Sequence, residues 1–319
     1  MTLFPFQSAH TLQDTVQDQA WLIEGLWSDQ AVGIVGGEPK CYKSFLALDM
    51  AVSVASATPC LRRYPVRRKG SVLLYAAEDS FPEVKKRLVG ICSAAGVALA
   101  DCDIQVITAP TLRLDLEDDR MRLSETVEHL KPSLLLLDPF VRLHRIDENA
   151  SREVAPILDF LRTLQRQLKT AVVVVHHSKK GAGKTRAGQA LRGSSEFHAW
   201  VDSFLYLRRV GDQLNMTVEH RSAPSQTGIC VELHSADESL ALRYVERVSQ
   251  EQTRQERIET PQVAIEHVLQ QARVPLLFDQ IRNACHARTQ TVSNALAALV
   301  EQGRVQKTSA GYKLPVSSH

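Results

Sequence analysis

Cysteine pairs at metal-binding spacing are absent from this sequence. The six cysteines are scattered and no Cys-x-x-Cys pair occurs, which excludes a disulfide framework and a zinc-finger site. Long apolar runs are missing too: the longest, such as 134–137 and 171–175, are far too short to span a bilayer. The first residues lack the charged and apolar stretches of a signal peptide. We therefore expect a soluble, cytoplasmic protein that does not bind membranes.

An excess of charge of one sign is also lacking. Of the 319 residues, 38 are Lys or Arg and 36 are Asp or Glu, so the formal net charge is +2. Any surface for nucleic acid must therefore be local. The 44% hydrophobic and 23% charged residues are ordinary for a globular chain and exclude a disordered or fibrous one. The length predicts two domains, or one large and one small domain.

Short apolar runs alternate with helical patterns up to about residue 250. This alternation is typical of βα units, in which parallel strands are buried under helices. Four strand-like runs with short connections follow and predict an antiparallel extension of the same sheet. The parallel strands are expected at 31–35, 71–76, 104–107, 133–137 and 171–175, the helices at 43–54, 81–95, 120–130 and 154–168, and the extension at 203–207, 213–218, 228–233 and 240–245.

A polar stretch at 249–259, rich in Gln, Glu and Arg, indicates a linker or a solvated helix. Three helical patterns follow, at 261–271, 277–284 and 290–302, and then two short runs at 305–308 and 311–314 that fit a hairpin. Three helices and a hairpin make a winged helix-turn-helix. The sequence thus predicts an α/β domain at 1–250 and a linker with a winged helix-turn-helix at 251–319.

The strongest motif lies between the first strand and the first helix. Gly37, Lys43 and Ser44 match the phosphate-binding pattern Gly-x-x-x-x-Gly-Lys-Ser/Thr, whereas Tyr42 stands where the second glycine is expected. In this pattern backbone N–H groups wrap a phosphate, the lysine reaches the β- and γ-phosphates, and the hydroxyl binds Mg²⁺. The alternative is an ordinary strand-to-helix turn, which the later motifs disfavour. The predicted nucleotide-binding residues are Gly36, Gly37, Glu38, Pro39, Lys40, Cys41, Tyr42, Lys43, Ser44 and Phe45.

Carboxylates follow two of the predicted strands. Asp138 directly follows a run of four leucines, as the aspartate of a Walker B strand does, and in that motif the carboxylate orients Mg²⁺. Glu78 and Asp79 follow the strand at 71–76, whose carboxyl end faces the ligand crevice of a parallel sheet. We expect Glu78 to polarise the water that attacks the γ-phosphate and Asp79 to cap the next helix. The alternative for each is a solvated turn after a buried strand.

Two histidines, His176 and His177, end the strand at 171–175. Beside a phosphate site they would donate hydrogen bonds to the γ-phosphate. The alternatives are metal binding and a solvated loop. Because neighbouring residues of a strand point to opposite faces, the pair is poorly placed to bind one metal ion.

In this order the motifs resemble the RecA-like core of the plasmid RepA-type replicative helicases and related hexameric ATPases. The resemblance covers roughly residues 15 to 246 and rests on 36–44, 75–79, Asp138 with 147–149, 176–179 and 192–195. It implies a RecA-like P-loop fold. It also implies that Glu78 is the catalytic base, that Asp138 is the Walker B aspartate and that His177 senses the γ-phosphate.

The same resemblance implies a hexameric ring with ATP between subunits, where a neighbour supplies an arginine finger. Arg192 and Arg221 match this role by position. Relatives often carry Lys-x-Arg at the second site, where this chain has Glu219 in place of the lysine. An arginine there would offset charge on the transferring phosphoryl group. The alternative for either arginine is a surface ion pair.

Two segments are candidates for contact with DNA. The loop at 179–188 carries four cations, no acid and three glycines, and its Lys179, Lys180, Lys184 and Arg186 would track a phosphate backbone. The alternative is a flexible solvated loop. The C-terminal region, from residue 257 on, contains seven basic and four acidic residues. Its third predicted helix would present Gln290 and Asn294 to base edges or phosphates. The alternative there is a winged helix that docks a protein.

Together these features predict an ATP-dependent DNA motor, a ring helicase or translocase that hydrolyses ATP with Mg²⁺ on single-stranded DNA. Its expected setting is plasmid or mobile-element replication, with a homohexamer and a replication protein as partners. The second hypothesis is an ATP-binding switch that assembles on DNA or a protein without unwinding. Tyr42 favours the switch, because a distorted phosphate loop would bind nucleotide without rapid turnover.

Overall fold

The computed structural model describes residues 4, 6–11, 21–178, 195–210, 213–236, 239–246, 261–272, 274–285 and 289–315. The chain divides into two compact units, Met1–Val245 and Glu246–His319. The boundary lies five residues before the expected position at 250, because the last strand of the first unit ends at Val245.

The first unit is built on one nine-stranded sheet with the strand order β11-β10-β9-β8-β3-β7-β6-β4-β5. Strands β8, β3, β7, β6, β4 and β5 pair in parallel, and β9, β10 and β11 add to β8 in antiparallel fashion. The predicted α/β sheet with its antiparallel extension is therefore confirmed, except that β8, expected as the first strand of the extension, runs parallel to β3 and is the last strand of the parallel part. The strands are β3 Val32–Gly37, β4 Val72–Ala76, β5 Ile104–Val106, β6 Leu134–Asp138, β7 Ala171–His177, β8 Ser203–Val210, β9 Gln213–His220, β10 Gln226–Ala236 and β11 Ser239–Val245.

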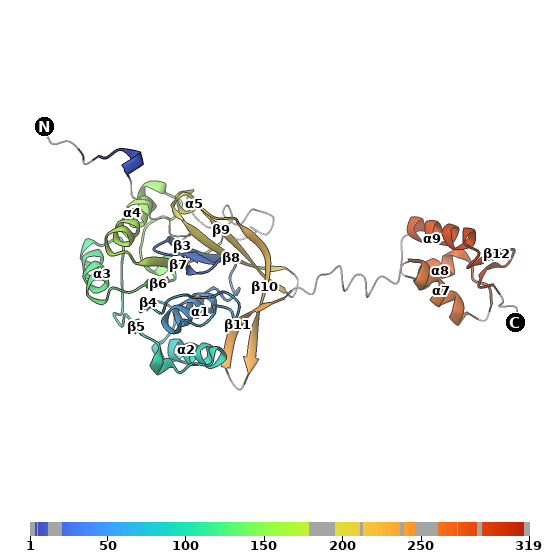
Figure 1. Ribbon diagram of the computed structural model, residues 1–319, viewed down its shortest axis with the longest axis horizontal. Coiled ribbons are helices and arrows are strands. Elements are labelled where there is room, and N and C mark those ends of the chain that lie inside the picture. The colour runs from blue at the N-terminus through green and yellow to red at the C-terminus, as the bar shows by residue number, and fades with distance from the viewer. Residues whose placement is uncertain are drawn as a thin grey trace. The chain divides into compact units, whose positions relative to one another are not determined.

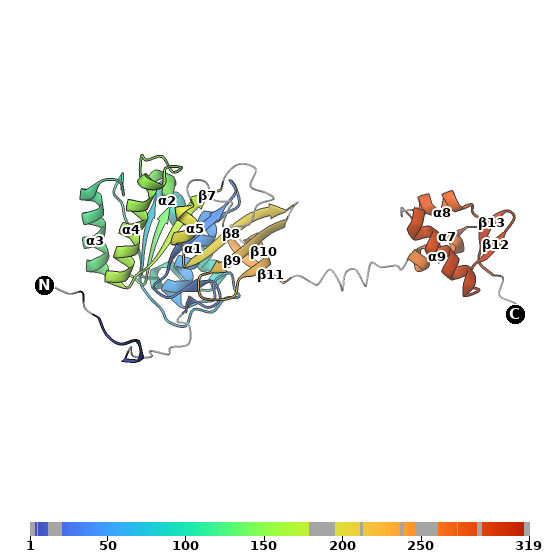
Figure 2. The same cartoon turned by 90° about the horizontal axis from the view of Figure 1, so that it is seen from above.

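Helices cover both faces of this sheet (Figures 1 and 2). Alternate residues of a strand point to opposite faces, so Val35 packs with α1 and α2, whereas Val32 and Ile34 pack with α3, α4 and α5. The central strands are buried throughout and form the middle of a three-layer core. The helices are α1 Lys43–Ser56, α2 Phe81–Ala95, α3 Glu117–Leu130, α4 Ser151–Leu168 and α5 Glu196–Trp200, and the short 3₁₀ turn η3 spans Phe140–Arg142.

A small hairpin precedes the sheet and was not expected from the sequence. Strands β1 Trp21–Ile23 and β2 Trp27–Ser28 pair in antiparallel fashion, and Trp27 is fully buried. A side-chain carbon at Gly33 would lie 2.8 Å from the Trp27 ring, so only glycine lets this ring pack on β3.

The second unit contains three helices and a two-stranded antiparallel sheet in its described residues. Its elements are α7 Pro261–Gln271, α8 Phe278–Ala284, α9 Thr289–Glu301, β12 Gln306–Thr308 and β13 Gly311–Lys313. It has a core of its own, in which Ile265, Ile281 and Leu299 are fully buried. Gly303 adopts a left-handed φ of 69° just after α9, as expected for a residue that ends a helix.

Among the residues that the structure describes, no helix is both long and apolar enough to cross a bilayer. The six cysteines are all thiols; five are buried and Cys285 is partly exposed. No cluster of three or more potential metal ligands from His, Cys, Asp and Glu occurs in these described residues.

Candidate nucleotide site

The predicted phosphate loop joins β3 to α1 through residues in left-handed backbone conformations. Lys40 has a φ of 62° and Tyr42 has a φ of 58° with ψ 32°. Gly37 is the last residue of β3, and a side-chain carbon there would lie 2.3 Å from the carbonyl oxygen of Leu207 on β8. The loop therefore needs glycine at 37, and at 42 it has the backbone conformation that glycine adopts most easily.

Tyr42 keeps this conformation despite its large side chain. Its ring packs edge-on to Phe45 at a centroid distance of 6.2 Å, and the Arg209 guanidinium of β8 lies 5.8 Å from the ring centroid. These contacts compensate for part of the cost of the left-handed backbone, which is about 1–2 kcal/mol. The mismatch with the phosphate-binding pattern thus changes the side chain and not the course of the backbone.

Lys43 begins α1 and is 5% exposed. Its Nζ donates to the carbonyl oxygen of Glu38, 2.9 Å away, so the lysine lies across the inside of the loop. Burial lowers the pKa of Lys43, while Cys41, Asp138 and Glu78 oppose this shift. A buried cation beside the phosphate loop is suited to bind a phosphate.

Asp138 ends β6, beside the end of β4, with Ala76 as its register partner. Asp138 is 8% exposed, and its carboxylate accepts a hydrogen bond from the Ser44 hydroxyl of α1. Burial raises the pKa of Asp138 to about 6, helped by the negative charges of Asp79 and Glu78 and opposed by Ser44 and Lys43. The structure therefore brings together the two predicted Mg²⁺ ligands, Ser44 and Asp138, from different elements.

Glu78 lies two residues beyond β4 and is exposed. Its Oε1 accepts a hydrogen bond of 2.8 Å from Nε of Arg142, in η3. No sequence pattern predicts Arg142 at this site, because the two residues are 64 positions apart and only the adjacent β4 and β6 bring them together.

Asp79 does not cap α2, contrary to expectation. The N-terminal cap is Ser80, whose side chain makes no capping hydrogen bond. The Asp79 carboxylate instead accepts two hydrogen bonds, of 2.6 and 3.1 Å, from the Arg87 guanidinium two turns along the helix. A bidentate charged pair is stronger than a single cap contact, which explains the difference.

The two histidines of β7 lie beside the phosphate loop, since Gly36 and Gly37 are the register partners of His176 and His177. His177 is partly exposed at the strand end, which suits a γ-phosphate contact. His176 is buried: its ring lies 4.6 Å from that of Phe197, and its Nε2 lies 3.9 Å from the Glu148 carboxylate. The residues point to opposite faces, so His176 belongs to the core.

Arg221 follows β9 and binds within its own chain. Its guanidinium donates to the carbonyl oxygen of Ala199 at 2.6 Å, close to the end of α5, and pairs with Asp202 at 3.4 Å. The side chain is 53% exposed. In a single chain Arg221 therefore makes the surface ion pair that was the alternative to a finger. Arg192 lies outside the described residues, as do Lys179, Lys180, Lys184 and Arg186 of the predicted DNA loop.

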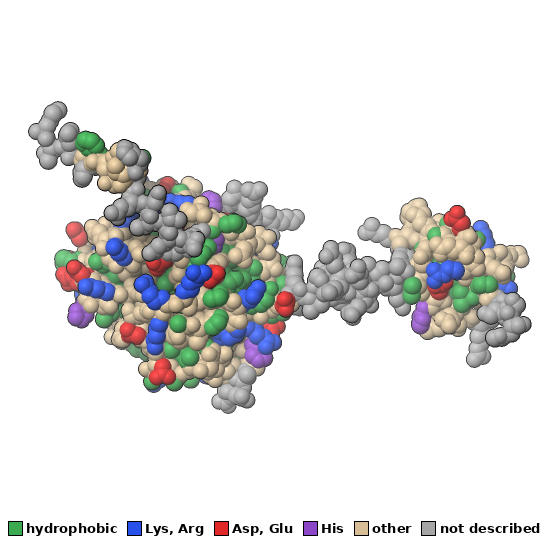
Figure 3. Space-filling view, in the orientation of Figure 1, with side chains coloured by type: hydrophobic (Ala, Val, Ile, Leu, Met, Phe, Trp, Pro, Cys, Tyr) green, Lys and Arg blue, Asp and Glu red, His purple; other side chains and the backbone are tan. Residues whose placement is uncertain are grey.

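Gln290 and Asn294 are exposed one turn apart on α9, where the Gln290 amide donates to Asn294 Oδ1 at 3.1 Å. This places both on one accessible face of the helix. On the first unit, the face in Figure 3 carries Lys and Arg interspersed with Asp and Glu, without a patch of one sign.

These residues fit a nucleotide with Mg²⁺. The left-handed turns and the buried Lys43 suit phosphates, and the Ser44 hydroxyl and Asp138 carboxylate are the oxygen ligands that Mg²⁺ prefers. The ten predicted nucleotide-binding residues, 36–45, run from the end of β3 into the first turn of α1. His177 ends β7, which adjoins β3, and Glu78 follows β4, which is three strands from β3.

The chain is similar to solved structures and to one protein family. The solved structure of a DnaB-like replicative helicase, studied with its interactions with primase, matches with a TM-score of 0.52 and 14% identity over 67% of this chain and 57% of the helicase. This chain thus spans a little over half the length of that helicase. The RadB recombinase gives a TM-score of 0.49 and 18% identity over 68% of this chain and 92% of the recombinase. A family model described as AAA domain matches residues 2–183, which is more than half of the chain. The protein therefore belongs to this AAA domain family and has a RecA-like P-loop ATPase fold.

Proposed function

We propose that the protein is an ATP-dependent DNA motor, a ring helicase or translocase of the RepA type. The observation that carries this proposal is the convergence of buried Lys43 and Asp138 with Ser44 and Glu78 at the carboxyl ends of β3, β6 and β4. This edge is where parallel α/β sheets bind their ligands.

The chemistry that we assign is hydrolysis of ATP to ADP and phosphate. Glu78 accepts a proton from the attacking water. The water oxygen bonds to the γ-phosphorus, and the bond between this phosphorus and the ADP oxygen breaks. Lys43 and the loop N–H groups hold the phosphates, and Mg²⁺ held by Ser44 and Asp138 would neutralise developing charge. His177, at the end of β7, donates to the γ-phosphate.

Assembly of identical subunits, as a hexameric ring, completes the site. Charge on the transferring phosphoryl group favours an arginine from a neighbour, for which Arg192 and Arg221 are the candidates. Arg221 would leave its contacts with Ala199 and Asp202 only if a phosphate offered a better partner. To act as a finger, Arg221 must therefore first break contacts within its own chain.

The proposed substrate of the motor is single-stranded DNA. The loop after β7 binds it through Lys179, Lys180, Lys184 and Arg186. A C-terminal winged helix recruits it through Gln290 and Asn294. The DnaB-like structure, a replicative helicase that interacts with primase, supports a role in replication, which we assign to a plasmid or mobile element. We place this activity in the cytoplasm.

The second candidate is an ATP-binding switch that assembles on DNA without unwinding it. One observation favours it: the Tyr42 ring, packed on Phe45 and beside Arg209, stands in the phosphate loop where the pattern has a glycine without a side chain.

The experiment that tests the motor is ATP turnover measured with and without single-stranded DNA, together with displacement of a labelled strand from a forked duplex. The motor predicts DNA-stimulated turnover and strand displacement that needs ATP. Turnover without displacement favours the switch, and absence of turnover contradicts both the motor and the ATPase assignment.

The loop variant Lys179→Ala/Lys180→Ala/Lys184→Ala/Arg186→Ala provides the matching DNA test. Affinity falls as salt rises, so the slope of log affinity against log salt is negative. Each lost phosphate contact should make this slope shallower by about 0.7. An unchanged slope would remove the loop from the DNA site. The variant Lys85→Ala/Lys86→Ala on α2 is the control, because it removes cations from a helix to which no DNA role is assigned.

A further inference from the structure

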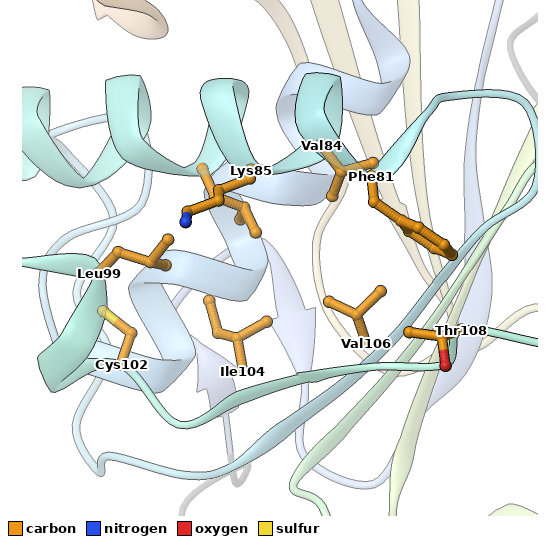
Figure 4. Close-up of a pocket in the computed structure, with 9 residues that line it drawn as sticks. Phe81, Val84, Lys85, Leu99, Cys102, Ile104, Val106 and Thr108 are labelled. Atoms are coloured by element: carbon orange, nitrogen blue, oxygen red, sulfur yellow. The ribbon is translucent and has the colours of Figure 1, made fainter.

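Two groups of side chains on opposite faces of the large sheet take no part in the mechanism proposed above. Under α2, Ile104 and Val106 of β5 point toward Phe81 in a cavity of about 290 Å³ with mostly apolar walls (Figure 4). The second group is polar and lies at the carboxyl end of β7, beside the core that α3, α4 and α5 cover. Its members, each at most 7% exposed, are His144, Glu148, His176, Ser178 and Tyr206. Buried polar side chains are costly, so their place next to a phosphate site calls for a role.

Alternation along β7 places this group around His177. Val174 packs with α4 and α5, whereas Val175 packs with α1 on the other face of the sheet. The ladder with β3 extends to Ser178, whose N–H bonds to that strand. His176 and Ser178 therefore share the face of Val174, and His177 between them shares the face of Val175, on which the phosphate loop runs into α1.

Glu148 holds the residue before His177. One of its oxygens, Oε2, lies 3.9 Å from Nε2 of His176, and the other, Oε1, lies 3.4 Å from Nε2 of His144. The His176 ring also stacks on Phe140 at a centroid distance of 5.6 Å. Separating a buried carboxylate from a buried imidazole is costly, so His176 has little freedom to move.

Tyr206 holds the residue after His177. Tyr206 of β8 and His176 of β7 have the same register partner, Gly36 of β3. Because Gly36 has no side chain, the Tyr206 ring can lie across β3 toward β7. Burial raises the pKa of Tyr206, and the Ser178 hydroxyl opposes this shift. Within the described part of the chain neither hydroxyl bonds to any other group, so the two hold each other.

We propose that Tyr206 and Glu148 are positioning residues that direct His177 to the γ-phosphate and thereby let the site distinguish ATP from ADP. They fix both neighbours of His177 on one face of β7, so its imidazole is held toward the other face. This inference rests on the proposed contact between His177 and the γ-phosphate, which ADP lacks. Displacement of a binding group by about 1 Å is enough to lose much of its effect.

Nucleotide affinities measured without hydrolysis test the proposal. The full-length protein is titrated with the non-hydrolysable analogue AMP-PNP and with ADP, each with Mg²⁺. His177→Ala should lower the affinity for AMP-PNP at least about tenfold and leave that for ADP within about twofold. Tyr206→Phe should lower the affinity for AMP-PNP at least about fivefold and also spare ADP. Glu148→Gln should do the same, and Tyr206→Phe, which removes a single oxygen, carries the test if Glu148→Gln does not fold.

Tyr75→Phe is the control, because Tyr75 is a buried tyrosine of β4 in the same core whose hydroxyl bonds to the backbone of Leu112. It should leave both affinities unchanged. The double variant Tyr206→Phe/His177→Ala should bind AMP-PNP no more weakly than His177→Ala alone, since Tyr206 acts through His177.

Three results would overturn the proposal: further weakening in the double variant, an equal loss of ADP affinity in Tyr206→Phe, or wild-type AMP-PNP affinity in Tyr206→Phe. Unchanged AMP-PNP affinity in His177→Ala would remove the γ-phosphate contact from the proposed function and would overturn the proposal with it. Absence of ATP turnover with the expected affinities intact would instead affect only the proposed function.

Discussion

Tyr42 shows how a single residue departs from a motif without changing the backbone. The pattern predicts glycine at this position, and the structure explains why: the backbone is left-handed there, with a φ of 58°. Tyrosine tolerates this with contacts to Phe45 and Arg209. The sequence alone shows only the mismatch.

A pair of variants isolates the backbone effect. Tyr42→Gly and Tyr42→Val both remove the ring, but a β-branched residue is a clear outlier at positive φ. We expect nucleotide affinity within about threefold of wild type for glycine and at least about tenfold lower for valine, which is about 1.4 kcal/mol. Titration with a fluorescent ATP analogue measures both. Equal affinities would show that the left-handed turn does not matter for binding.

Arg142 is predicted to position Glu78. Its ion pair with Glu78 is exposed and contributes at most about 1 kcal/mol, so Arg142→Ala should leave thermal stability almost unchanged. Turnover should fall about tenfold with KM unchanged, because the carboxylate loses its orientation, and Arg142→Lys should restore part of it. Arg145→Ala, on the same loop, is the control. A KM effect without a change in kcat would place Arg142 in substrate binding.

At the scale of elements, buried polar groups fix how helices and loops join the sheet. Asp49 on α1 is fully buried, pairs with Arg62 and accepts the Leu61 N–H at 2.7 Å. Removing one partner of a buried pair leaves an unpaired charge, so Asp49→Ala should cost about 3–5 kcal/mol in urea unfolding. Arg67→Ala, whose pair with Glu24 is exposed, should change stability by less than about 1 kcal/mol. Equal effects would show that the Asp49 pair is energetically unimportant.

His220 joins β9 to the β1–β2 hairpin in its neutral form. The Gly25 carbonyl can only accept, so Nε2–H of the neutral ring donates to it at 3.3 Å. Nδ1 therefore accepts from the Ser203 hydroxyl at 3.1 Å, whose oxygen also accepts the N–H of Ser28. Burial lowers the pKa of His220 below its usual 6.5, and the Gly25 carbonyl opposes the shift.

The consequence is a pH dependence of stability. Since the folded pKa is lowered, the unfolded chain binds more protons between the two pKa values. This stabilisation is therefore present above about pH 6.5 and is lost as pH falls through the folded value. Chemical unfolding from pH 5 to 8 should show the slope in wild type and a smaller one in His220→Gln. An identical slope in both proteins would assign it to other groups.

The elements predicted best are those with continuous apolar runs. The parallel strands and α1, α2 and α4 were found close to their expected ranges, because a buried strand and an amphipathic helix have clear sequence patterns. β1, β2 and α5 were missed, since each spans five residues or fewer and depends on tertiary packing, as Trp27 does on Gly33. The pairs Glu78–Arg142 and Asp79–Arg87 were missed for the same reason: spatial proximity selects them.

At the scale of the whole molecule, the two units have separate hydrophobic cores. A chain that ends at residue 246 should therefore fold and bind nucleotide with wild-type affinity, while its affinity for DNA should fall. Nucleotide titration and DNA binding at one salt concentration measure this. A truncated chain that fails to bind nucleotide would show that the first unit depends on the second.

The measurement that tests the central claim most directly is steady-state turnover of MgATP by Glu78→Gln beside wild type, with nucleotide affinity measured on both. The amide keeps the shape of the side chain but cannot accept the proton of the attacking water, so we predict turnover at least about 100-fold lower with affinity unchanged. Lys43→Ala should instead lose affinity, because the buried cation no longer offsets the phosphate charge. Wild-type turnover in Glu78→Gln would contradict the assignment of this site.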